Sequence, residues 1–183
     1  MCDSGGLSRA DIDAVAEAFA HASEGDQMVY RWITRTTELA RTGRCPGLDL
    51  DAIQQWIAAT WRNPRVAALP GRRQDLHSLA GQLALARGDA DGAQREFDRA
   101  LDEAWSPDVA AEHATLLASK GEYRRALAHL DHYESLRARQ PPPHGWSMRR
   151  AHAWVLERQG YWAFEIGRLR HNLETEIAQQ APQ

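Results

Sequence analysis

Apolar residues recur at intervals of three and four along most of the chain, whereas alternation at intervals of two is nearly absent. This spacing places apolar side chains on one face of an α-helix, so it predicts an all-α fold without a sheet. Glycine and proline positions divide the pattern into about nine helices. They are expected over about 8–22, 26–42, 49–62, 72–87, 90–104, 108–119, 122–138, 146–158 and 161–178.

The expected helix ends coincide with residues that cap or break helices. Gly88, Gly121 and Gly160 each follow a helical stretch, where glycine readily adopts the left-handed conformation that ends a helix. Ser106-Pro107 separates two further helices, because proline cannot continue the preceding one. The run Pro141-Pro142-Pro143 predicts a stiff, extended spacer.

Small and aromatic residues repeat at a fixed distance in the second half of the chain. Gly88 and Gly121 lie 33 residues apart, and the same offset relates Ala93 to Ala126. The first unit, 72–107, carries His77, Ala80, Gly81, Ala84, Ala93, Phe97, Ala100 and Pro107. The second unit, 107–140, carries Ala114, Leu117, Gly121-Glu122-Tyr123, Ala126, Leu130 and Tyr133. A degenerate third unit, 146–179, keeps Leu156, Gly160-Tyr161 and Leu169.

This pattern resembles the tetratricopeptide repeat family, whose units of about 34 residues are helix–turn–helix pairs. The resemblance implies a right-handed stack of antiparallel helix pairs, with Phe97 filling the space that small residues leave between helices. Residues 1–71 would form an N-terminal helical segment, and 72–183 would form the repeats, together making one continuous helical domain. Ala114 stands where the family has its close-contact glycine, and Glu165 where it has a small residue.

The resemblance also implies a concave groove lined by the first helix of each pair. Carrying the register over gives the groove residues Ser78, Gln82, Leu85, Ala111, Thr115, Ala118, Arg150, Trp154 and Arg158. The last three place an aromatic ring between two arginines, a combination enriched at binding hot spots and suited to gripping a carboxylate. They favour an acidic or C-terminal peptide as ligand. The alternative is that Trp154 packs against the final helix.

Composition narrows the class of protein. The chain has 183 residues and a formal net charge of −3, without the basic excess of a nucleic-acid-binding domain. No stretch reaches the ~18 apolar residues of a membrane span, so no direct membrane insertion of this chain is expected. Cys2 and Cys45 form neither a zinc-binding nor a redox motif, and neither is expected to be needed for folding.

Candidate chemistry is sparse. His129 and His132 are three residues apart, which allows both to face a metal, but no further ligands follow at a recognisable spacing. Both are therefore interpreted as solvated, and His113 as isolated on its helix. No nucleophile, phosphate-binding or zinc-protease motif occurs. We expect no enzyme activity, catalytic residue, metal or cofactor.

The sequence thus favours a non-catalytic protein- or peptide-binding scaffold of undetermined oligomeric state. Two alternatives stay open: a helical structural appendage of a larger membrane-bound synthase or transferase, and a catalytic helical domain without a recognisable motif. The C-terminal part, with Gln-Gly-Tyr-Trp before a helix, resembles the soluble repeat tail of some bacterial multi-spanning membrane proteins. A cytoplasmic location is expected, or a periplasmic one for such a tail.

Overall fold

The computed structural model of this chain describes residues 14, 17, 50–64, 68, 70–139 and 160–180. Within these ranges it has no strand and six helices. They are α3 (Leu50–Trp61), α5 (Pro70–Ala86), α6 (Ala90–Ala104), α7 (Pro107–Ala118), α8 (Tyr123–Arg139) and α10 (Tyr161–Gln179). The all-α prediction is confirmed for this part of the chain.

The six helices match the expected ones closely. The helix predicted over 90–104 has those bounds, and most other ends differ by one residue. α5 begins at Pro70, two residues early, because the fixed φ of proline suits the first turn of a helix. The helices expected over 26–42 and 146–158, most of 8–22 and both cysteines lie outside the described residues. Ala14 and Glu17 are helical, in agreement with the helix predicted over 8–22.

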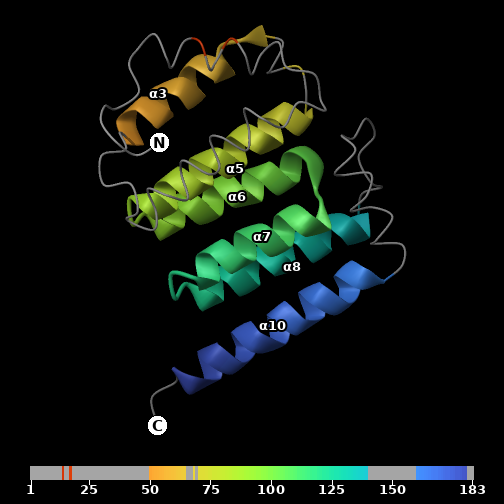
Figure 1. Cartoon of the computed structure of the whole chain (residues 1–183). Coiled ribbons are helices and arrows are strands. Elements are labelled where there is room, and N and C mark those ends of the chain that lie inside the picture. The colour runs from red at the N-terminus through yellow and green to blue at the C-terminus, as the bar shows by residue number, and fades with distance from the viewer. Residues whose placement is uncertain are drawn as a thin grey trace.

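The helices lie one after another in chain order, from α3 to α10 (Figure 1). α5 packs chiefly against α6 and α7 against α8, which gives two helical hairpins joined by Trp105 and Ser106. α3 packs against α5 at one end of this stack, and α10 packs against α8 and α7 at the other. Consecutive hairpins therefore share one core.

The turns inside the two hairpins are built alike. In the first, the Asp89 N–H donates to Ala84 O at 2.9 Å and the Gly88 N–H to Leu85 O at 3.1 Å. In the second, the Glu122 N–H donates to Leu117 O and the Gly121 N–H to Ala118 O. Gly88 and Gly121 have φ of 80° and 77°, the left-handed conformation of a Schellman cap. The 33-residue period thus has a structural counterpart in two equivalent turns.

Phe97 fills the contact between the two hairpins. Its ring is fully buried and lies directly over Gly81 of α5, where an added Cβ would overlap it. The same ring stacks on His113 of α7, with ring centroids 4.1 Å apart. The prediction that Phe97 fills the core between these three helices is confirmed.

Ion pairs and histidine–aspartate contacts join α6 to α8 and α8 to α10. Asp98 of α6 pairs with His129 of α8 at 2.6 Å. Asp131, 33 residues after Asp98, pairs with Arg170 of α10 at 2.7 Å. Asp91–Arg125 and Asp102–His132 extend the same contact between α6 and α8. Each junction therefore has acids on the earlier helix and bases on the later one.

Candidate binding surface and buried histidine pair

The predicted groove residues of α5 face the interior. Ser78, Gln82 and Leu85 are only 3%, 4% and 2% exposed. The Ser78 hydroxyl lies 3.1 Å from Nε2 of His113, across the contact between α5 and α7. Because α5 is enclosed by α3, α6 and α7, these three side chains offer no surface to a ligand in this arrangement.

The predicted residues of α7 are accessible to different degrees. Thr115 is exposed, and its hydroxyl donates to the carbonyl of Ala111 at 2.7 Å. Ala111 and Ala118 are partly buried and pack against the core. The three residues are spaced by four and three, so they share one face of α7. Arg150, Trp154 and Arg158 lie outside the described residues, and their role in a groove stays a prediction.

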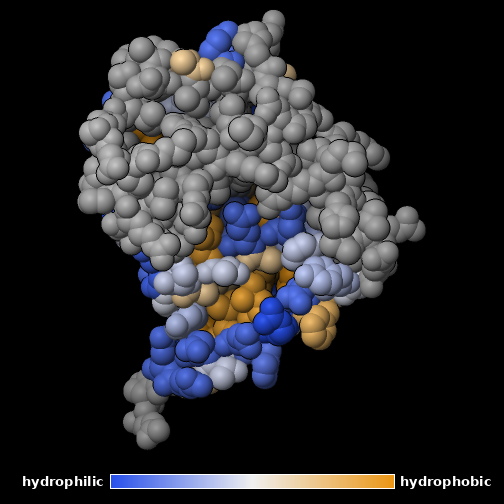
Figure 2. All heavy atoms as spheres, in the orientation of Figure 1, coloured by the Kyte–Doolittle hydropathy of each residue, from blue (hydrophilic) through white to orange (hydrophobic). Residues whose placement is uncertain are grey.

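An apolar area is exposed over the space between α7 and α10, with hydrophilic residues around it (Figure 2). On α10, Leu169 is partly buried against the core, one turn from the buried residues Ile166 and Leu173. We name this area the α7–α10 surface and assign to it, as a hypothesis, Ala111, Thr115 and Ala118 of α7 and Leu169 of α10. The side chains assigned to it are small on α7 and aliphatic on α10.

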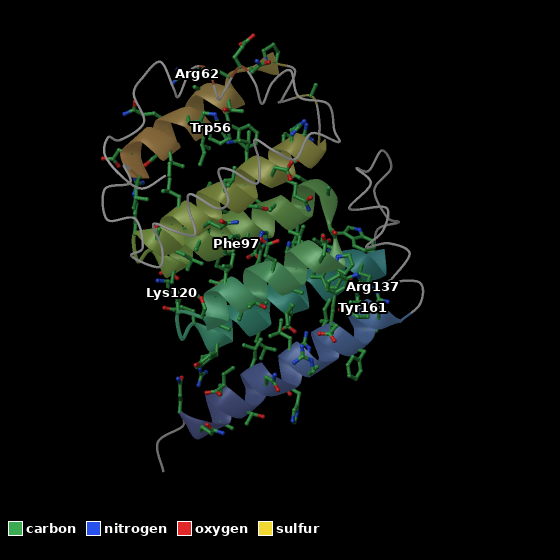
Figure 3. The ribbon with its side chains drawn as sticks, viewed as in Figure 1. Trp56, Arg62, Phe97, Lys120, Arg137 and Tyr161 are labelled. Atoms are coloured by element: carbon green, nitrogen blue, oxygen red, sulfur yellow. The ribbon has the colours of Figure 1, made fainter. Side chains whose placement is uncertain are left out.

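A second apolar feature lies at the start of α10. Tyr161 and Phe164 are 46% and 68% exposed, the largest exposed hydrophobic residues of the described part of the chain (Figure 3). Tyr161 belongs to the predicted repeat turn, whereas the sequence pattern does not single out Phe164.

The interior of the hairpin junction holds two histidines. His113 and His129 are 1% and 0% exposed, and their ring centroids are 5.3 Å apart. His129 Nδ1 bonds Asp98 Oδ1 at 2.6 Å. Among the described residues, His113 Nδ1 and His129 Nε2 are buried without a hydrogen-bond partner. Burial, and secondarily the charge of His129, hold the pKa of His113 well below its usual value.

The interpretation of His129 as a solvated residue is wrong, and His113 is not isolated. His113 of α7 and His129 of α8 both contact the Phe97 ring of α6. The spacing of apolar residues in the sequence does not indicate these contacts. His132 is partly exposed and bonds Asp102 at 2.9 Å. His129 and His132 thus have separate aspartate partners. In the ranges that the structure covers, no three His, Cys, Asp or Glu side chains gather as a metal site would require.

Comparisons of the chain with protein-family models, curated proteins and solved structures gave no match. Of the helices described above, none combines the length and apolar character needed to cross a bilayer.

Proposed function

We propose that this chain is a non-catalytic scaffold of tetratricopeptide-like repeats that binds a protein or peptide segment on the α7–α10 surface. The observation that carries the proposal is the exposed apolar area between these two helices, to which we assign the predicted groove residues of α7. The equivalent turns at Gly88 and Gly121 and the ring of Phe97 over Gly81 support the repeat architecture.

The side chains of this surface indicate what it would bind. Ala111 and Ala118 are short, so a partner's backbone can approach α7 closely, and Leu169 offers aliphatic area for an apolar side chain. Thr115 already donates its hydroxyl to its own helix, which leaves its methyl group for contact. The ligand is therefore a segment with apolar side chains along one face, held mainly by buried apolar area.

A matched pair of substitutions tests the site. Peptides selected from a random library on the purified chain would be titrated against the parent and two variants by fluorescence polarisation. Thr115→Arg places a long charged side chain on the α7–α10 surface, whereas Thr175→Arg makes the same change on α10 at another exposed threonine. Both threonines donate to the carbonyl four residues earlier, so each substitution removes the same kind of hydrogen bond within its own helix.

We expect Thr115→Arg to raise Kd by about tenfold or more, which corresponds to about 1.4 kcal/mol, and Thr175→Arg to leave it within about twofold. Equal affinity of all three proteins for every selected peptide would place the binding site elsewhere. Failure to select any peptide would contradict the scaffold proposal itself.

A further inference from the structure

The junction of the two hairpins contains a continuous set of rings from three helices. Phe97 of α6 stacks on His113 of α7 with an interplanar angle of 17°. His129 of α8 is tilted against both, with centroids 6.1 Å from Phe97 and 5.3 Å from His113. All three side chains are at most 1% exposed, so any charge that forms there is removed from water.

The two histidines differ in what surrounds them. His129 has the carboxylate of Asp98 at 2.6 Å, which can balance a positive charge. His113 contacts the Ser78 hydroxyl, the Phe97 ring and the other imidazole, none of which carries negative charge. Its remaining ring nitrogen, Nδ1, is buried without a hydrogen-bond partner in the described part of the chain.

Several other titratable groups of the packed helices have partners of their own. His77 of α5 bonds Glu96 of α6 at 2.7 Å, and Arg170 of α10 bonds Asp131 and Glu134 of α8. The pKa of Glu96 is lowered chiefly by its hydrogen bond with His77. The carboxylate of Asp98 at the junction is likewise bonded to His129.

We propose that the stacked His113 makes the junction between the two hairpins acid-sensitive, so that protonation of this side chain releases one hairpin from the other. This goes beyond the proposed binding function, because it concerns the pH range in which the two hairpins stay packed together. Burial of a neutral imidazole supports the direction: the folded state resists the proton that the unfolded chain accepts.

The sign follows from linkage. A histidine whose pKa is lowered by folding adds nothing to pH dependence above its unfolded value of about 6.5 and destabilises the fold progressively below it. Between pH 7.5 and 5.5, one such histidine raises the unfolding equilibrium constant about tenfold. That loss continues at lower pH until the folded-state pKa is reached.

Urea unfolding of the full chain at pH 7.5, 6.5 and 5.5, followed by far-ultraviolet circular dichroism, tests this inference. His113→Phe keeps a planar ring against Phe97 but cannot titrate, and His113→Gln is a second variant without a titrating group. His132→Gln is the control, because it removes a partly exposed histidine from α8. We expect the rise in the unfolding equilibrium constant between pH 7.5 and 5.5 to be about tenfold smaller in both His113 variants than in the parent. The control should change this rise by less than threefold.

Histidine ring resonances of the folded parent, followed by NMR during acid titration, give a readout that needs no variant. We expect the His113 ring to stay neutral down to the pH at which the native signals disappear. A His113 resonance that titrates near 6.5 in the folded chain would overturn the inference, as would His113 variants with the parent's full pH dependence. None of these measurements uses a ligand, so their outcome is independent of the proposed binding function.

Discussion

Two helix-interior glycines, Gly81 and Gly167, should respond in opposite ways to substitution by alanine. Neither has a positive φ, so the backbone of each accepts a Cβ. Gly167 faces open space, and Gly167→Ala should stabilise the protein by about 1 kcal/mol through helix propensity alone. At Gly81 the new methyl group would overlap the buried Phe97 ring.

The overlap opposes the gain in helix propensity. Overpacking a core costs about 1–3 kcal/mol, so Gly81→Ala should range from neutral to about 2 kcal/mol destabilising. The two variants should then differ by about 1–3 kcal/mol in their free energy of unfolding. With a urea m-value of about 2 kcal/mol/M, their midpoints should lie about 0.5–1.5 M apart.

Urea denaturation followed at 222 nm measures both midpoints. The double variant Gly81→Ala with Phe97→Leu checks the cause, because a smaller side chain at position 97 makes room for the methyl group. The two changes should show a coupling of about 0.5–3 kcal/mol, with the double variant more stable than the sum of the single effects. If Gly81→Ala were as stabilising as Gly167→Ala, the Phe97 ring would not lie over Gly81.

Three simpler perturbations test the core, one turn and the cysteines. Phe97→Ala should cost about 3–5 kcal/mol, measured by urea unfolding, because a fully buried aromatic ring is removed. Gly121→Ala should destabilise by about 1 kcal/mol in the same assay, since alanine is strained at a φ of 77°; a neutral effect would contradict the turn geometry. Reductant should leave the melting temperature unchanged, as expected if Cys2 and Cys45 form no structural disulfide; a large drop would contradict this.

Helix positions could be predicted from the sequence because local signals determine them. Gly88 and Gly121 mark turns that need a left-handed residue, and Pro107 starts α7 at its first position. The small residues around Phe97 indicate a close helix contact, and the structure has that contact. These features depend on one residue and its near neighbours, so spacing alone reveals them.

The exposure of the candidate groove depends on distant segments, which spacing does not report. Helical periodicity places Ser78 on one face of α5, but it does not say that α7 covers this face and brings His113 to the hydroxyl. Gln82, one turn after Ser78, is buried as well, whereas Thr115, its counterpart 33 residues later in α7, is exposed. Only the packing order distinguishes these two faces.

The same limit explains why the sequence does not indicate which of His113 and His129 has a carboxylate partner. A proton on His129 would face the carboxylate of Asp98 at 2.6 Å, whereas a proton on His113 would face a hydroxyl, a phenyl ring and a second imidazole. Asp98 lies 31 residues from His129, so no local motif indicates that the two side chains form a pair. The contact that fixes the hairpins in register thus leaves one histidine compensated and the other sensitive to acid.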